Sequence, residues 1–114
     1  MSVKLTTRQV GDVTVVDAVG RITLGEGASA FRDKIRELAS AGHKRLLLNL
    51  GEVSYIDSSG IGEMVSGFTT ITNQGGVVKL LSLTKRVKDL LQITKLYTVF
   101  EVFEDEAEAV RSFA

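Results

Sequence analysis

Hydrophobic and polar residues alternate in two runs at the start of the chain, which predicts β-strands over residues 3–9 and 12–19. Gly11-Asp12 lies between the runs and is typical of a hairpin turn. A third run, Arg45-Leu46-Leu47-Leu48-Asn49-Leu50, is apolar with little alternation, as in a strand buried on both faces. Two further strands are predicted over residues 77–83 and 99–103.

Between these strands, apolar residues recur at helical spacing. Residues 28–41 place Phe31, Ile35 and Leu38 on one face of a predicted helix, and Gly42 ends it. A second helix is predicted over residues 59–73, with an apolar stripe formed by Ile61, Met64, Val65, Phe68 and Ile71. Helices over residues 84–93 and 105–113 complete the pattern, with a loop at 20–27 and a turn at 51–56. The alternation predicts an α/β fold, a small mixed sheet with an N-terminal hairpin followed by parallel strands, and about four helices.

The composition excludes several classes of function. The 114 residues are expected to form one domain, 1–114, with 14 basic and 14 acidic residues and no net charge to attract nucleic acid or a membrane surface. The absence of cysteine excludes disulfides and thiol catalysis, and His43, the only histidine, cannot build a multi-histidine metal site. No apolar run is long enough to span a membrane, and the N-terminus lacks a signal-peptide pattern, so a cytoplasmic location is expected.

Gly25-Glu26-Gly27-Ala28-Ser29-Ala30 matches the dinucleotide-binding pattern G-x-G-x-x-A. That pattern should follow its strand at once, whereas Gly20-Arg21-Ile22-Thr23-Leu24 intervenes here. The preceding strand is also predicted to be half of a hairpin and not the first strand of a βαβ unit. We therefore favour a glycine-rich loop that leads into a helix, and a small nucleotide-binding protein is the less favoured reading.

Hydrolysis by a serine nucleophile is also disfavoured. Neither Ser58 nor Ser59 has the G-x-S-x-G surroundings of a nucleophile elbow, and His43 lies at the opposite end of the strand at 45–50. We expect a non-catalytic protein without a cofactor or a metal.

Asp57-Ser58-Ser59-Gly60-Ile61-Gly62 marks the corner where a strand gives way to a helix. One interpretation is structural: Asp57 or Ser58 caps the helix and the glycines make the turn. A cap does not explain Gly60, Gly62 and Gly67 in one helix, since each costs up to about 1 kcal/mol relative to alanine. Their small side chains favour a docking surface, with tight internal packing as the competing explanation.

The charges near this corner determine the surroundings of a phosphate added there. Residues 46–78 contain no Lys or Arg but include Glu52, Asp57 and Glu63, so a phosphate would add to an acidic surface. At a helix N-terminus the phosphate would still be tolerated by the fold. Lys85-Arg86-Val87-Lys88 begins the next predicted helix, and the loop before it is expected to neighbour the Ser58 loop, because loops after successive parallel strands share one edge of the sheet.

The run from Asn49 to Gly62, together with the hairpin, the Gly75-Gly76 break and Leu90-Leu91-Gln92-Ile93-Thr94-Lys95-Leu96, resembles the STAS domain family. The resemblance covers nearly the whole chain and is closer to free-standing anti-sigma factor antagonists than to transporter tails. It implies that Ser58 is phosphorylated by a serine kinase that is also an anti-sigma factor, and that a PP2C-type phosphatase reverses the modification. The unphosphorylated form would bind the kinase and release the sigma factor. The resemblance places Asp57 beside Ser58 and puts Ser59, Gly60 and Gly62 on the docking edge. With two residues of the same predicted helix added, the residues expected to bind a partner are Asp57, Ser59, Gly60, Gly62, Glu63 and Ser66.

One departure concerns the loop after the second strand. Many antagonists have Gly-x-[LI]-Asp there, whereas this chain has Gly20-Arg21-Ile22-Thr23-Leu24-Gly25, without the acidic residue. The departure leaves the identity of the partner open. A scaffold STAS domain that binds partners without phosphate control is the main alternative, and monomer and homodimer both stay open.

Overall fold

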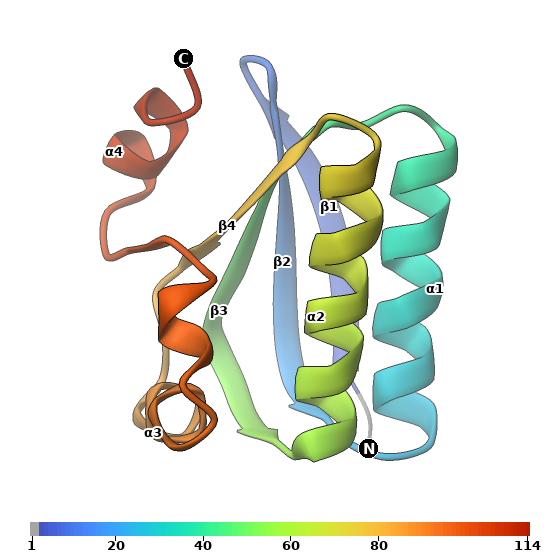
Figure 1. Ribbon diagram of the computed structural model, residues 1–114, viewed down its shortest axis with the longest axis vertical. Coiled ribbons are helices and arrows are strands. Elements are labelled where there is room, and N and C mark those ends of the chain that lie inside the picture. The colour runs from blue at the N-terminus through green and yellow to red at the C-terminus, as the bar shows by residue number, and fades with distance from the viewer. Residues whose placement is uncertain (1–2) are drawn as a thin grey trace.

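Five strands form one sheet in the order β1-β2-β3-β4-β5 in the computed structural model, which describes residues 3–114 (Figure 1). β1 (Val3–Val10) and β2 (Val13–Ile22) form the antiparallel hairpin. β3 (Arg45–Ile56), β4 (Val77–Leu81) and β5 (Val102–Phe103) each run parallel to the preceding strand. The predicted mixed sheet is confirmed.

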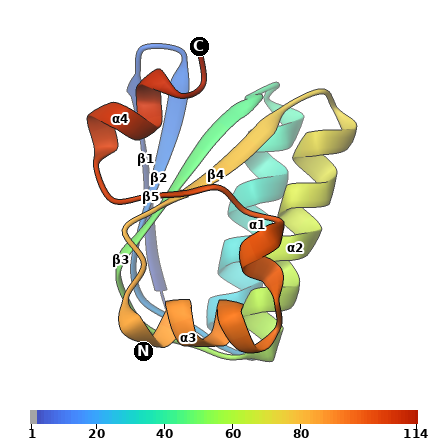
Figure 2. The same cartoon turned by 60° about the vertical axis from the view of Figure 1, so that its left-hand side comes forward.

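Two long helices cover one face of this sheet, and a short one packs on the other (Figures 1 and 2). α1 (Glu26–Ser40) and α2 (Ser58–Asn73) lie side by side on the first face. α3 (Lys85–Ile93) lies across the end of the sheet at which α2 begins, and a 3₁₀ turn, η1 (Leu96–Thr98), follows it. α4 (Glu106–Arg111) packs against β4 and β5 on the second face. Among residues 3–114, no helix combines the length and the hydropathy needed to cross a membrane.

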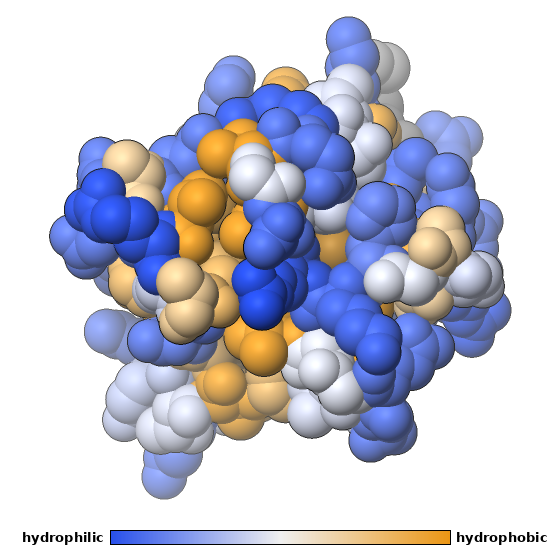
Figure 3. All heavy atoms as spheres, turned by 90° about the horizontal axis from the view of Figure 1, so that it is seen from above, coloured by the Kyte–Doolittle hydropathy of each residue, from blue (hydrophilic) through white to orange (hydrophobic). Residues whose placement is uncertain are grey.

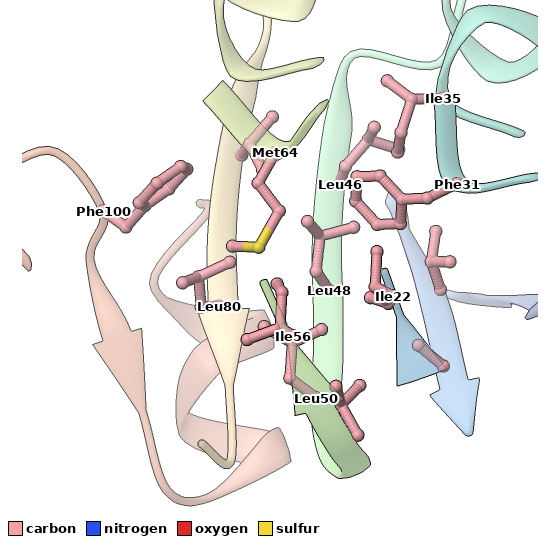
Figure 4. Close-up of a cluster of buried hydrophobic side chains, with 14 of the residues drawn as sticks. Ile22, Phe31, Ile35, Leu46, Leu48, Leu50, Ile56, Met64, Leu80 and Phe100 are labelled. Carbon is pink, nitrogen blue, oxygen red and sulfur yellow. The ribbon is translucent and has the colours of Figure 1, made fainter. Parts of the chain in front are cut away.

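The larger hydrophobic core lies between the sheet and the helix pair. Side chains from β2, β3, β4, α1 and α2 point toward one another there, including Ile22, Phe31, Leu48 and Met64 (Figure 4). β3 is the central strand, and its run Leu46-Leu47-Leu48 is buried on both faces. Leu46 and Leu48 enter this core, and Leu47 enters the smaller core under α4. The pattern seen in the sequence is thus explained by helices on both faces.

Hydrogen bonds from Lys79 and an ion pair from Arg8 attach α4 and its C-terminal end to the sheet. The ammonium group of Lys79, which is buried, donates to the backbone carbonyl and the hydroxyl of Ser112 at 2.9 Å each. On the edge strand, Arg8 pairs with Asp17 at 2.7 Å and with Glu106 at 2.6 Å. Seen from the end that carries the hairpin turn and the C-terminus, mostly hydrophilic residues surround a smaller hydrophobic group (Figure 3).

The predicted turn over residues 51–56 is wrong. β3 continues to Ile56 and stays paired with β2, with Val53 opposite Gly20 and Ile56 opposite Ile22. Two bulges interrupt its alternation. The partner of Asp17 is Asn49, but the partner of Val19 is Glu52, so β3 carries one extra residue at this point. A second extra residue lies between Val53, the partner of Gly20, and Tyr55, the partner of Arg21. The predicted loop over residues 20–27 is also too long, because β2 extends to Ile22 and α1 begins at Glu26.

Candidate functional site

The side chain of Asp57 caps α2. Its Oδ1 accepts a hydrogen bond from the backbone N–H of Gly60 at 3.0 Å, and its extended backbone is typical of an N-cap. Of the two residues that the sequence offered as caps, the structure selects Asp57. The Ser58 hydroxyl is therefore not needed to close the helix.

The second carboxylate oxygen of Asp57 holds the loop between β2 and α1. Oδ2 accepts a hydrogen bond from the backbone N–H of Leu24 at 2.9 Å. This bond, followed by those from the N–H groups of Gly60 and Ser59, holds the pKa of the Asp57 carboxyl below its usual value, although partial burial opposes the shift. One carboxylate thus fixes two loops at the same edge of the sheet.

Ser58 is exposed at the first turn of α2, beside this fixed carboxylate. Gly62 and Ser66 follow it at four-residue intervals and are also exposed. On a helix this spacing places the three residues on one side. A Cβ added at Gly62 would meet no atom within 4 Å, so the surface is open there. Ser58, Gly62 and Ser66 therefore form a low, polar, solvent-facing stripe, hereafter the α2 stripe.

Gly60 lies outside this surface, and its predicted contact with a partner stays a prediction. It is buried, and a Cβ at this position would overlap the carbonyl oxygen of Ile22. Gly67 is also buried, and its Cβ would come within 3.0 Å of the Ile35 side chain. For these two glycines the explanation is tight internal packing. They let α2 approach β2 and α1 closely and so set the position of Ser58.

Ser59 and Glu63 occupy the side of α2 that turns toward α1. Both are half-buried, and a carboxylate oxygen of Glu63 lies 3.8 Å from the Arg32 guanidinium of α1. These two residues are thus partly accessible at the junction of the two helices. Their predicted contact with a partner remains a prediction.

On its other side, Ser58 borders an open hollow of about 480 Å³, lined by Tyr55, Ile56, Asp57, Ser58, Arg86, Asp89, Leu90 and Ile93. Four of these residues come from α3, so the expected proximity of the α3 basic cluster to Ser58 is confirmed. The expectation of an acidic surface needs correction. Residues 46–78 contain no cation, but the fold brings Arg86 from outside that range to the same hollow.

Arg86 stacks on an aromatic ring at this hollow. Its guanidinium carbon lies 4.1 Å from the ring centroid of Tyr55, and that of Arg21 lies 5.8 Å from the same centroid. Sequence reasoning did not select Tyr55, Arg86 or Leu24 as site residues. The basic cluster at 85–88 was a signal for Arg86, but no local pattern pairs it with Tyr55.

The glycine-rich segment after β2 has structural roles. Gly25 has a φ of 94°, which favours glycine, and a Cβ on Gly27 would come within 2.5 Å of the Arg21 carbonyl oxygen. The argument that β2 belongs only to a hairpin is wrong, since β2 also pairs parallel to β3 across α1. His43 follows Gly42 in a loop, as expected, and its Nδ1 lies 2.9 Å from the Thr14 hydroxyl.

Residues 4–109 match the STAS domain family. The chain belongs to this family. It is 32% identical over 102 residues to the anti-sigma-B factor antagonist of Bacillus subtilis, which covers 90% of this chain and 92% of that protein. The STAS chain is also 31% identical over 86 residues to a putative anti-sigma factor antagonist of Thermotoga neapolitana, covering 75% of this chain and 76% of that one.

Solved STAS structures share its fold. A putative anti-sigma factor antagonist from Thermotoga maritima superposes with a TM-score of 0.89 at 24% identity, covering 96% of this chain and 93% of that one. The Bacillus cell fate determinant SpoIIAA in its phosphorylated form gives a TM-score of 0.77 at 19% identity, covering 97% of this chain and all of that one. The curated relatives are named as anti-sigma factor antagonists, two of them from Bacillus subtilis and Listeria monocytogenes.

Proposed function

We propose that this STAS domain is a cytoplasmic anti-sigma factor antagonist controlled by phosphorylation of Ser58. The unphosphorylated form binds an anti-sigma factor that is also a serine kinase, and the sigma factor is released. The kinase transfers the γ-phosphoryl group of ATP to Ser58 Oγ, with loss of the hydroxyl proton and formation of ADP. A PP2C-type phosphatase hydrolyses the phosphoserine and restores the binding form.

The proposal rests on the different roles of two neighbouring residues, Asp57 and Ser58. Asp57 supplies the helix cap and the tie to Leu24, while the neighbouring hydroxyl stays exposed on a fixed backbone. A residue that must enter a kinase active site and later a phosphatase active site needs this combination of exposure and position. The names of the relatives support the role of antagonist for this chain.

The α2 stripe is the surface we propose for partner contact, with Asp57, Ser59 and Glu63 at its margin. The exposed members have small side chains, so a partner backbone can approach α2 closely. A phosphate at the end of this stripe facing a partner carboxylate costs about 4 kcal/mol at 4 Å and an effective dielectric near 20. That is enough to weaken binding by roughly a thousandfold.

The test is phosphorylation of the purified chain by an anti-sigma factor kinase with ATP, followed by intact-mass measurement. One phosphate should be added to the parent protein and none to Ser58→Ala. Ser59→Ala is the matched control, because it removes the neighbouring hydroxyl from the same turn, and it should still take up one phosphate. Binding of the kinase without any phosphate transfer would instead favour the scaffold STAS domain.

A further inference from the structure

Three charged residues line the hollow beside Ser58, and their partners differ. Asp57 accepts backbone hydrogen bonds through both carboxylate oxygens, from Gly60 and from Leu24. Asp89 pairs with Lys85 on the same helix at 2.8 Å. Within residues 3–114, no carboxylate lies within 4 Å of the Arg86 guanidinium, which rests on the Tyr55 ring at 4.1 Å. Arg86 is thus a cation of this hollow that no carboxylate of residues 3–114 neutralises.

Stacking leaves the hydrogen-bonding capacity of a guanidinium unused. Its five N–H donors lie in the plane of the group, so a face placed on an aromatic ring leaves the donors at the rim. These donors fit a phosphate well, because two parallel N–H groups can bind two of its oxygens, and Ser58 lines the same hollow. Arg86 is exposed and the hollow is open, so the side chain can swing within it.

We propose that the hollow between α2 and α3 is a phosphomonoester-binding site within this chain, in which Arg86 binds the phosphate carried by Ser58. The inference rests on the proposed modification of Ser58 and specifies what the modified residue contacts. The phosphate occupies the hollow, the Arg86 guanidinium donates to its oxygens, and α3 becomes linked to the start of α2. Phosphorylation thereby withdraws both Arg86 and the hollow from a partner, in addition to adding negative charge.

Tyr55 positions Arg86 for this contact. The ring holds the guanidinium at the rim of the hollow before the phosphate arrives, which reduces the conformational freedom lost on binding. Arg21 also approaches this ring, at 5.8 Å, but it does not line the hollow. Arg21 is therefore a control of the same charge, on the same ring, without access to the phosphate.

The experiment uses the full chain with phosphoserine installed at position 58 during synthesis, so that no kinase is needed. The pKa of the phosphate is measured by phosphorus NMR in the parent, Arg86→Ala, Arg86→Lys and Arg21→Ala backgrounds. Arg86→Ala should raise this pKa by about 0.5 pH units or more, because the paired dianion loses its cation. Arg86→Lys should restore part of the difference, and Arg21→Ala should match the parent.

A second measurement reports on Tyr55. Ring-proton shifts of Tyr55 should change on phosphorylation in the parent as Arg86 turns toward the phosphate, and they should change much less in Arg86→Ala. Equal phosphate pKa values in the parent and in Arg86→Ala would overturn the inference, as would equal effects of Arg86→Ala and Arg21→Ala. Neither result would affect phosphorylation of unmodified chain by the kinase, so this inference and the proposed function fail separately.

Discussion

The Asp57 carboxylate accepts a hydrogen bond from the backbone N–H of Leu24, a residue 33 positions earlier in the chain, at 2.9 Å. Through its other oxygen the same carboxylate caps α2. The loop after β2 and the loop after β3 are thus fixed to each other beside Ser58. The exposed Leu24 side chain, 80% accessible, is presented next to the site by this bond.

Replacing Asp57 should therefore destabilise the fold and loosen the site. Asp57→Ala removes a helix cap and a loop hydrogen bond, and we expect it to lower the free energy of unfolding by about 1–3 kcal/mol. Asp57→Asn keeps one carbonyl oxygen for the cap but loses the second acceptor and the charge. Its free energy of unfolding should therefore fall less than that of Asp57→Ala. Urea unfolding of the parent and both variants measures these free energies. An Asn variant that is as unstable as the Ala variant would contradict the expected order.

The contribution of Asp57 should depend on pH in one direction. Its pKa is lowered in the folded protein, so the folded state favours the ionised carboxylate. The resulting stability is fully present above the unfolded pKa of about 3.9 and is lost as the pH falls through the lower folded pKa. The difference in unfolding free energy between the parent and Asp57→Ala should be constant between about pH 5 and 7 and should shrink below pH 4.

Measuring this difference by urea unfolding at several pH values provides the test. Asp89→Ala is a suitable control, since Asp89 borders the same hollow but holds only an exposed pair with Lys85. Exposed pairs of this kind contribute about 0–1 kcal/mol. A difference for Asp57→Ala that grew as the pH fell would contradict the hydrogen-bond explanation.

Gly60 and Gly62 are two residues apart on α2 but should respond oppositely to alanine. At Gly60 the new Cβ would overlap the Ile22 carbonyl oxygen, and backbone cannot move aside as a flexible side chain can. We expect Gly60→Ala to lower the free energy of unfolding by about 2 kcal/mol or more. At Gly62 nothing lies within 4 Å, and alanine should stabilise the helix by up to about 1 kcal/mol.

Gly62→Ala also tests the α2 stripe. Its methyl group projects from the proposed contact surface, so binding to the kinase should weaken although the fold is more stable. Thermal unfolding and a binding titration on the same sample separate the two effects. Kinase affinity equal to that of the parent would show that the partner does not approach α2 closely at Gly62.

Ser58→Asp should weaken binding to the kinase without destabilising the fold. A carboxylate at the first turn of α2 interacts favourably with the helix dipole, by about 0.3–1 kcal/mol, so the Tm should remain nearly that of the parent. Binding to the kinase should weaken, because the added charge lies in the proposed interface. Ser58→Ala should keep both the Tm and the binding. A large loss of stability in Ser58→Asp would mean that this position is mainly structural.

The order of strands and helices followed from the sequence because each element's pattern is local. Leu46-Leu47-Leu48 predicted a strand buried on both faces, and the Asp57-Ser58 corner was recognisable from the types and spacing of its residues. The continuation of β3 to Ile56 was missed, since the bulge opposite Asp17 and Val19 interrupts the alternation on which such a prediction depends. A shift in register is a property of two strands and does not show in one.

The sequence by itself determined the fold class, the family and the candidate residue Ser58. Tertiary structure decided which neighbours Ser58 has. Gly60 and Gly62 are alike in sequence, but the approach of Ile22 buries one and leaves the other open. Arg86 reaches the hollow beside Ser58 only because parallel strands bring the start of α3 to the same edge of the sheet. Periodicity reports which face of an element is buried, whereas contacts between distant residues depend on how the elements pack.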